Sequence, residues 1–300
     1  FIPTFEVALA HDAAKVKGVD IFDGTWFVSR KLDGVRCICF VRGDDVRFFS
    51  RNGKEFLTLG RVADEIRRLG ITDLVLDGEL CLMNENGSDD FQGILKQIQR
   101  KDHTIDNPRY QVFDILLAGE FAGDDDSPLF STRLDSREHL LGDLGSSTIL
   151  EILPQVRIND EDALEELKAQ SKDSNWEGLI ARKDTNYSSG RSKHMLKIKE
   201  FFDDEYVVTG LIMGPQRVIV NGKEVGEDML SAVTIEHKGS QVQVGSGFTI
   251  DQRRHYYRNI GEIMGATITV QYFETTTDQH GNHSLRFPVF KVNHGVAREV

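Results

Sequence analysis

The sequence predicts an α+β fold with antiparallel sheets, followed by a smaller unit made almost entirely of strands. Apolar runs of strand length alternate with short amphipathic helices as far as about residue 200. Beyond that point, five strand-like segments surround a single helical one. A length of 300 residues also suits two domains better than one small core.

The first part of the chain is predicted from its hydrophobic periodicity and its turn residues. A hairpin turn is expected at Asn52-Gly53, because this dipeptide adopts the positive φ angles of tight turns. Gly70 is expected to end a helix. The expected strands are 26–30, 37–49, 74–83, 110–119, 176–183 and 194–199, and the expected helices are 60–70, 89–101, 134–144 and 160–172.

The second part begins after an acidic segment, "EFFDDE" at 200–205, which we interpret as a linker. Five short strands and one helix in about a hundred residues predict a small closed barrel of the OB type. We therefore expect domains at 1–202 and 203–300. The expected strands are 206–213, 231–237, 241–245, 267–275 and 285–292, with a helix over 249–261.

Charge and composition limit the classes of function. The formal net charge is −12, which is unusual for a protein that binds a polyanion. Residues 182–199 nevertheless hold six Lys and Arg residues and one acid, so a basic groove on an acidic body remains possible. No apolar run reaches the ~20 residues of a membrane helix, and no membrane partner is expected. Three cysteines without metal spacing indicate reduced core thiols and a cytoplasmic or nuclear-type reducing compartment.

Several predicted strands carry charged residues inside apolar runs. One such doublet alone is typical of an edge strand with a solvated face. Five in one domain instead predict a shared cleft in which carboxylates and cations neutralise one another. Residues i and i+2 share a face of a strand, so Asp77 and Glu79 point the same way, as do Lys197 and Lys199. The groups are Lys31 with Asp33 and Arg36, Asp77 with Glu79, Asp114, Glu177 with Arg182, and Lys197 with Lys199.

Such a cleft suits phosphate chemistry. Lys197 and Lys199 could hold phosphate oxygens as point charges, and Glu177 could hold a magnesium ion. We expect these positive neighbours to lower the pKa of Lys31, which would make its amine a nucleophile towards phosphorus. Phe113 offers an aromatic face to a base, although a core role explains the same residue equally well.

The segment "KLDGVR" at 31–36 resembles the nucleotidyl-lysine motif of the covalent nucleotidyltransferases, which include polynucleotide ligases and mRNA capping enzymes. Further segments follow in the order of that family. "GRS" at 190–192 and "RFPVF" near the end look most like compact ATP-dependent DNA ligases of the viral and phage kind. The matching segments are "SRNG" (50–53), "LDGEL" (76–80), "VFDIL" (112–116), "EGLIAR" (177–182), "MLKIK" (195–199) and "LRFPVF" (285–290).

The resemblance implies a nucleotidyltransferase domain with ATP-grasp-like sheets, followed by an OB domain, and a role for each matching residue. Lys31 would be the adenylated nucleophile, and Phe113 would stack on adenine. Asp77 would support the site or contact DNA. The remaining assignments are Ser29 and the backbone of Arg30 for the adenine edge, Arg36 and Glu79 for the ribose, Glu177 for the metal, Lys197 and Lys199 for the α-phosphate, and Arg51 and Arg191 for phosphates of the DNA.

The chain departs from the family pattern at its end. Ligases usually carry a basic and acidic cluster after "RFPVF" that acts on pyrophosphate, whereas "KVNHGVAREV" follows here. His294 stands about where an arginine is common. The candidates in the OB domain are Arg286, Lys291, His294 and Arg298.

The implied activity is that of an ATP-dependent DNA ligase that seals nicks in duplex DNA through lysyl-AMP and DNA-adenylate. The implied substrate is ATP with Mg²⁺ or Mn²⁺, the implied partner is nicked double-stranded DNA, and the implied state is a monomer. A viral or phage origin fits the compact pattern. An RNA ligase and a GTP-dependent capping enzyme remain alternatives, as does a non-catalytic nucleic-acid-binding protein that keeps the fold.

Overall fold

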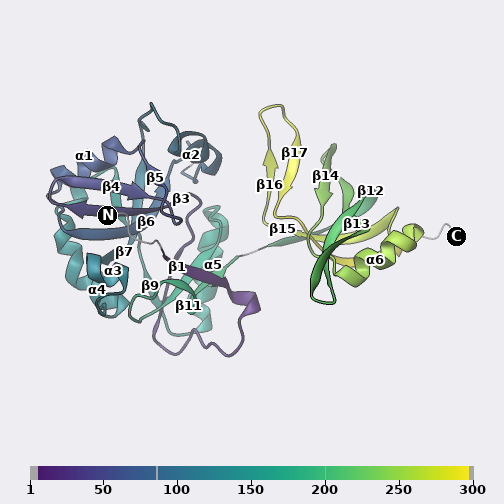
Figure 1. Ribbon diagram of the computed structural model, residues 1–300, viewed down its shortest axis with the longest axis horizontal. Helices are drawn as coiled ribbons and strands as arrows, with labels where there is room; N and C mark the ends of the chain where they lie inside the picture. The colour runs from purple at the N-terminus through teal and green to yellow at the C-terminus, as the bar shows by residue number, and fades with distance from the viewer. Residues whose placement is uncertain (1–5, 86, 200, 297–300) are drawn as a thin grey trace. The chain divides into compact units, whose positions relative to one another are not determined.

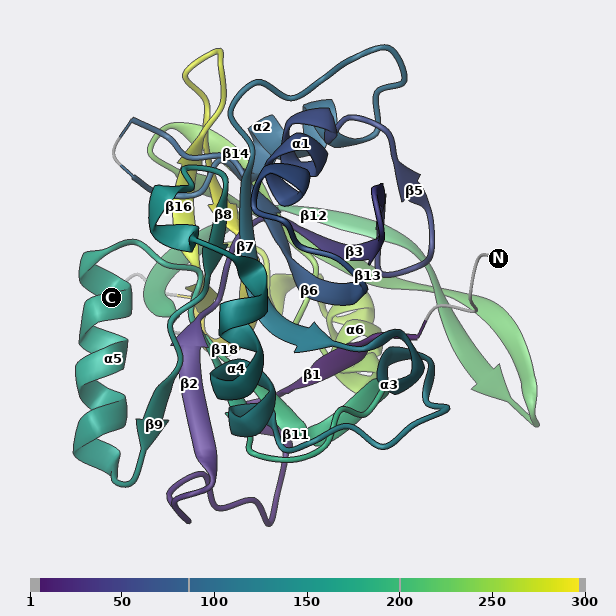
Figure 2. The same ribbon diagram turned by 90° about the vertical axis from the view of Figure 1, so that its left-hand side faces the viewer.

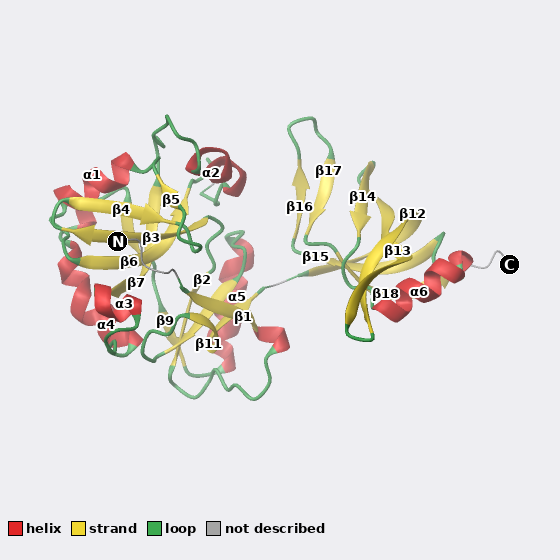
Figure 3. Cartoon of the chain, in the orientation of Figure 1, coloured by secondary structure: helices red, strands yellow, loops and turns green. Residues whose placement is uncertain are grey.

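The structure is a computed structural model that describes residues 6–85, 87–199 and 201–296 (Figure 1). The chain divides into two compact units, Phe1–Lys199 and Glu200–Val300. Strands outnumber helices among the described residues of both units (Figure 3). The first unit combines its strands with several helices, whereas strands make up most of the second.

The described strands of the first unit form two sheets. One has five strands in the order β1-β11-β10-β2-β9, and the other has six in the order β5-β4-β3-β6-β7-β8. The pairs β1–β11 and β7–β8 are parallel, so the expectation of purely antiparallel sheets is wrong at these two places. The strands are β1 (Ala8–Asp12), β2 (Trp26–Arg30), β3 (Val35–Arg42), β4 (Asp45–Phe49), β5 (Glu55–Phe56), β6 (Leu74–Cys81), β7 (Arg109–Leu116), β8 (Leu150–Ile152), β9 (Val156–Ile158), β10 (Leu179–Lys183) and β11 (Gly190–Ile198).

The five-stranded sheet has one apolar face and one polar face. Val28, Leu179 and Leu196 belong to a buried cluster that the helix α5 (Glu161–Asp173) covers. α5 packs against β9 and β10 (Figure 2). Since side chains alternate along a strand, the neighbouring residues face away from α5. Ser29 and Lys197 both pair with Ile180 across the sheet, so these side chains share the polar face.

The six-stranded sheet is divided in the same way. Cys37, Leu76 and Leu80 enter a core that the helices α1 (Gly60–Arg68) and α2 (Phe91–Ile98) complete. The intervening residues lie on the opposite face, where Arg36 is paired with Glu79 and Ile38 with Asp77. Asp77 and Glu79 therefore share a face, as strand alternation predicts.

The helices differ from expectation near the middle of the chain. The helix predicted at 134–144 is α4 (Phe130–Arg137), which continues as a 3₁₀ turn over Glu138–Leu141. It begins earlier because Phe130 and Arg133 are buried against the rest of the unit. The end of the strand predicted at 110–119 is instead a short helix, α3 (Ala118–Ala122).

The second unit is a closed five-stranded barrel. Its sheet order is β14-β13-β12-β15-β18, and the Phe290 N–H donates to the Ser246 carbonyl at 2.8 Å, which joins the two ends. A side-chain capping box between Thr249 and Gln252 starts the helix α6. The elements are β12 (Phe202–Val220), β13 (Lys223–His237), β14 (Ser240–Val244), α6 (Ile250–Arg258), β15 (Ala266–Tyr272), β16 (Glu274–Thr277), β17 (His283–Arg286) and β18 (Val289–Val296).

The linker prediction at 200–205 is wrong for its described part. Phe202–Glu205 form the first rungs of β12 and pair with β15. Their side chains are exposed, and the segment is held as a strand by main-chain pairing that composition does not reveal. β12 and β13 also run much further than predicted, to a turn at Asn221-Gly222 with φ of 50° and 76°. That dipeptide is a hairpin signal in the sequence.

Other features bear on function only indirectly. Cys37, Cys39 and Cys81 are free and buried, as the sequence predicts for core thiols. Across the described residues, no helix combines the length and the apolar character needed to span a bilayer.

Candidate active site

Two lysines from different segments share one carboxylate. Lys31 follows β2, Glu177 precedes β10, and Lys199 follows β11. The Lys31 Nζ donates to Glu177 Oε2, and the Lys199 Nζ donates to Glu177 Oε1 at 2.7 Å. The Glu177 side chain is only 6% exposed, against 22% for Lys31 and 16% for Lys199. The three charges predicted to meet in one cleft therefore do meet, with a carboxylate as the immediate partner of Lys31.

Gly178 explains how Glu177 is held between the two lysines. Its φ is +147°, and a Cβ at this position would lie 2.4 Å from the Ile198 carbonyl oxygen. Only glycine allows β10 and β11 to approach so closely here. The Gly178 carbonyl also accepts the Lys31 N–H at 2.8 Å. The main chain thus fixes the lysine and the carboxylate relative to each other.

Burial and neighbouring charges shift the pKa values of this cluster in opposite directions. Burial alone would raise the pKa of Glu177, but the charge of Lys31 and hydrogen bonds from both lysines outweigh it and lower that pKa. Burial lowers the pKa of Lys199, and the positive charges of Lys31 and Lys197 add to this effect against the attraction of Glu177. Glu177 is therefore ionised at neutral pH, and it is placed to bind cations.

The face of the six-stranded sheet carries a second polar group. Arg36 donates to both Asp77 oxygens, at 2.6 and 2.7 Å. Glu79 accepts the Gly34 N–H at 2.9 Å. Burial raises the pKa of Glu79 to about 7, although Lys31 and the Gly34 hydrogen bond oppose the shift. Because Glu79 accepts from the N–H of Gly34, three residues after Lys31, its carboxyl lies against the segment that carries the lysine.

Phe113 lies on β7 in a small apolar cluster with Leu32, Cys81 and Leu153. It is buried, and the Arg36 guanidinium lies 4.8 Å from its ring centroid. Leu32, which follows Lys31 directly, belongs to this cluster, so the Phe113 ring lies against the segment that carries the lysine. Both the base-stacking and the core interpretation of Phe113 agree with this position.

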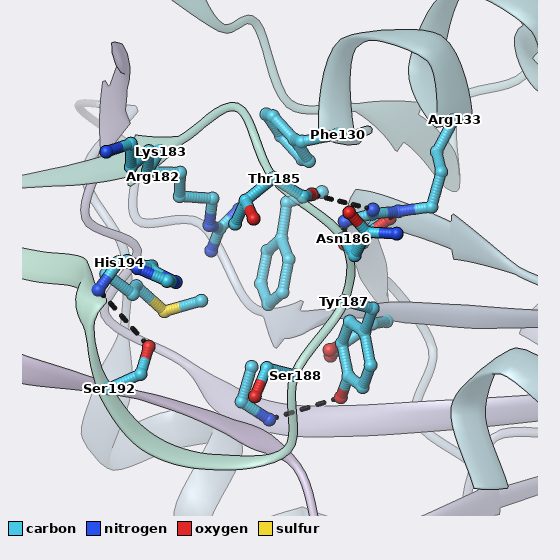
Figure 4. Close-up of a pocket in the computed structure, with 15 residues that line it drawn as sticks. Phe130, Arg133, Arg182, Lys183, Thr185, Asn186, Tyr187, Ser188, Ser192 and His194 are labelled. Carbon is cyan, nitrogen blue, oxygen red and sulfur yellow. Dashed lines mark hydrogen bonds and ion pairs between the residues drawn. The ribbon is translucent and has the colours of Figure 1, made fainter. Parts of the chain in front are cut away.

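Arg182 is a buried cation to which sequence reasoning assigned no role. Its guanidinium lies 4.2 Å from the Phe113 ring centroid, and its Nε and Nη1 atoms have no hydrogen-bond partner among the described residues. Burial lowers the pKa of Arg182 to about 10. It lines a pocket together with Arg133 (Figure 4). Asp114, which also lines this pocket, accepts two hydrogen bonds from the Arg133 guanidinium, at 2.7 and 2.8 Å.

Asp89 is another residue that the sequence did not single out. Its carboxylate accepts from the Arg30 guanidinium at 2.7 Å and from the Asp33 N–H at 2.9 Å. It therefore ties the end of β2 to the segment that follows Lys31. No motif marks Asp89, because its partners become neighbours only when the loop before α2 folds back.

The remaining predicted residues of the first unit have varied surroundings. Ser29 is buried and its Oγ has no hydrogen-bond partner among the described residues. Lys197 lies on β11 on the polar face. Arg51 is exposed in the turn after β4. Arg191 is exposed and donates to the Ala10 carbonyl at 2.7 Å.

The candidates of the second unit belong to β17 and β18. Arg286 pairs with Glu274 at 2.9 Å, and Lys291 is exposed. His294 lies 2.7 Å from Thr269 Oγ1. Arg298 lies outside the described residues.

The carboxylates of the described residues include one candidate ligand for a divalent metal. Among residues 6–85, 87–199 and 201–296, no cluster of three or more His, Cys, Asp or Glu side chains could hold an ion by itself. Magnesium is commonly held by one or two carboxylates together with substrate phosphates. The ionised carboxylate of Glu177 fits that requirement, provided that an incoming ion displaces one of its lysines.

Comparisons with known proteins decide the family. Residues 8–199 match the model of the "ATP dependent DNA ligase domain", and residues 221–292 match the "DNA ligase OB-like domain". The chain belongs to the ATP-dependent DNA ligase family. The matched regions include Lys31, Glu177 and Lys199 in the first domain and, in the second, the barrel strands β13, β14 and β15 with the separate β16–β17 hairpin. The family assignment therefore confirms the nucleotidyltransferase and OB-like folds.

Named relatives agree with the family. A DNA ligase of Haloferax volcanii is 29% identical over 300 residues, covering 89% of this chain and 49% of that protein. A DNA ligase of African swine fever virus (isolate Tick/South Africa/Pretoriuskop Pr4/1996) is 25% identical, covering 86% and 63%. The solved structure "Pmar-Lig_PreS3" matches with a TM-score of 0.75 and 26% identity, over 97% of this chain and 68% of that one. The chain thus spans about half the length of the first relative and under two thirds of the second.

Proposed function

We propose that the protein is the catalytic core of an ATP-dependent DNA ligase that seals 5′-phosphate/3′-hydroxyl nicks in duplex DNA. The observation that carries this proposal is the carboxylate of Glu177 shared between Lys31 and Lys199, in a chain of the ligase family. A nucleophilic amine, a metal-binding carboxylate and a phosphate-binding cation are the groups that adenylyl transfer requires.

The reaction begins at Lys31. Its deprotonated amine attacks the α-phosphorus of ATP, a P–N bond forms, and the bond to the pyrophosphate oxygen breaks. Lys197 and Lys199 hold the α-phosphate oxygens, where negative charge develops. Glu177 would hold Mg²⁺ or Mn²⁺, which would supply further positive charge against the phosphates. AMP then passes to the 5′-phosphate of the nick, and the 3′-hydroxyl displaces it.

The other residues position the substrates in this proposal. Phe113 stacks on adenine, and Arg36 and Glu79 face the ribose. Asp77 acts through Arg36, whose guanidinium it holds by two hydrogen bonds. The adenine edge faces Ser29 and the backbone of Arg30, DNA phosphates contact Arg51 and Arg191, and Arg286, Lys291, His294 and Arg298 are the candidates for the adenylation step in the OB-like domain.

Two further proposals concern the state of the protein. We propose a monomer that acts on nicked double-stranded DNA, which size-exclusion chromatography with and without a nicked duplex would test. We also propose a reducing compartment of the cytoplasmic or nuclear type, because Cys37, Cys39 and Cys81 are all free.

Two labelled substrates test the activity. Incubation with Mg²⁺ and ATP labelled in the α-phosphate should give a covalent protein band that survives denaturation. Chasing that adduct with a 5′-phosphorylated nicked duplex should release the label and join the strands. Labelling by GTP alone, or joining of nicked RNA but not of DNA, would contradict the proposal and favour a capping enzyme or an RNA ligase.

A further inference from the structure

Three buried polar atoms near the end of β2 lack a partner among the described residues. They are Ser29 Oγ and both side-chain atoms of Gln155, Nε2 and Oε1. Buried carboxamides and hydroxyls are almost always hydrogen-bonded, because leaving them unpaired costs their hydration. Since neither end of the Gln155 carboxamide is bonded within the described part of the chain, both ends are available to a ligand.

Strand register places the two residues together. β2 and β9 are antiparallel, and their last pair is Val28 with Val156. Extended by one residue beyond the start of β9, this register sets Gln155 opposite Ser29, which lies on the polar face of the sheet. Gln155 also follows Leu153 by two residues, and Leu153 packs with Leu32 and Phe113. The Leu153 N–H donates to the Val112 carbonyl at 2.8 Å, next to Phe113, and Val156 pairs with Val28. Gln155 therefore lies on the segment that crosses from the sheet of Phe113 to the sheet of Ser29.

The chemistry of a carboxamide matches the edge of a purine. Its oxygen accepts and its NH₂ group donates, side by side in one plane. Adenine presents the complementary pair, a donor at N6 and an acceptor at N1. We infer that Gln155 binds the adenine edge of ATP through both ends of its carboxamide, with Ser29 Oγ beside it, and is a specificity-determining residue. This inference rests on the proposed function.

The Gln155→Glu variant separates this role from a structural one. A carboxylate only accepts hydrogen bonds, so it faces the N1 lone pair of adenine unfavourably. Guanine instead offers two adjacent donors, N1–H and the N2 amino group, to the same carboxylate. The variant should therefore weaken ATP binding and strengthen GTP binding, so that the ATP:GTP preference changes by at least about tenfold. Loss of packing alone would weaken both nucleotides alike.

Binding is measured by calorimetry in a Lys31→Ala background, where no covalent step interferes. Gln170→Glu, an exposed change of the same kind on α5, is the matched control and should leave the ATP:GTP preference unchanged. An unchanged preference in Gln155→Glu would overturn the inference. If that variant fails to fold by circular dichroism, Gln155→Met replaces it. The Met variant should lose ATP affinity, and undiminished ATP binding would equally overturn the inference.

The proposed function can fail separately. If the unmodified protein forms no lysyl-AMP at all, the ligase proposal is wrong whatever Gln155 does. If it forms lysyl-AMP from ATP, and Gln155→Glu keeps the same nucleotide preference, only the role of Gln155 is wrong.

Discussion

Two ionic clusters of the first unit combine the same kinds of charge in different proportions. In one, Lys31 and Lys199 share the single carboxylate of Glu177, so the three groups carry a net positive charge. In the other, Arg133 meets Asp114 one to one, with two hydrogen bonds and almost no exposure. The first arrangement leaves positive charge for a phosphate, whereas the second cancels its charge inside the protein.

The type of cation differs for a physical reason. The planar guanidinium of arginine matches both oxygens of a carboxylate and stays charged, which suits a permanent buried pair. A lysine amine is a point charge on a flexible stem, and it can lose its proton and act as a nucleophile. The comparison indicates that the lysine cluster serves chemistry and that the arginine pair serves stability. The following predictions test this division, from the largest expected effect to the smallest.

Lys31→Ala should abolish the covalent AMP adduct. The main chain of Lys31 is fixed by the Gly178 carbonyl and its amine by the Glu177 carboxylate, and no other amine among the described residues has this combination of contacts. Lys31→Arg should abolish it as well, since a guanidinium keeps its proton at neutral pH. Labelling with ATP in the presence of Mg²⁺ measures both. An adduct of undiminished yield in either variant would assign the nucleophile to another residue.

Asp114→Asn should destabilise the first unit by about 3–5 kcal/mol, because Arg133 becomes a buried charge without its partner. Arg182, a second buried cation nearby, increases the cost. Urea unfolding measures the change. Asp64→Asn, which removes an exposed partner of Arg67, is the control and should change stability by no more than about 0.5 kcal/mol. An equal loss of unfolding free energy in Asp114→Asn and Asp64→Asn would contradict the assignment of the Arg133–Asp114 pair to stability.

Lys199→Ala should slow adduct formation by about 10²–10³-fold, because a cation facing the developing charge of the α-phosphate is lost. Stability should change little, since Glu177 keeps Lys31 as a partner. Single-turnover labelling gives the rate. Lys193→Ala, which changes an exposed lysine of β11 with no part in the proposed site, is the matched control and should label at the rate of the unmodified protein. A strong loss of stability in Lys199→Ala would instead indicate a structural role.

Glu79→Gln should change how stability depends on pH. The folded pKa of Glu79 is raised from 4.5 to about 7, so the folded state holds a proton that the unfolded state has released in this range. Stability of the unmodified protein therefore falls as pH rises from about 4.5 to about 7. The Gln variant lacks this loss, and it should gain about 2–3 kcal/mol relative to the unmodified protein between pH 5 and pH 8. Parallel pH profiles of the free energy of unfolding would contradict the assignment.

Local sequence patterns predicted the parts of the site that depend on one strand alone. Asp77 and Glu79 share a face because side chains alternate with a period of two. The helices α1 and α5 follow from apolar spacing and their boundaries. The fold was also predicted, since the motifs around Lys31, Glu177 and Lys199 stand in the order of the ligase family.

Contacts between distant strands could not be predicted in this way. Composition suggested a linker at 200–205, yet main-chain pairing with β15 makes Phe202–Glu205 a strand. Asp89 and Gln155 carry no motif, and each gains its place only from the residues that the fold brings beside it. Periodicity reports which face a residue occupies, and it does not report what lies opposite that face.

The sequence alone determined the residue types, their alternation on each strand, and thereby the family and the presence of a nucleotidyl-lysine motif. The tertiary structure alone decided that Lys31 meets Glu177, 146 positions away, and that Arg182 is buried against Phe113. The physical reason is that alternation is a property of one strand's backbone geometry. Pairing and burial depend on which strands become neighbours, and that is settled only by the packing of the whole unit.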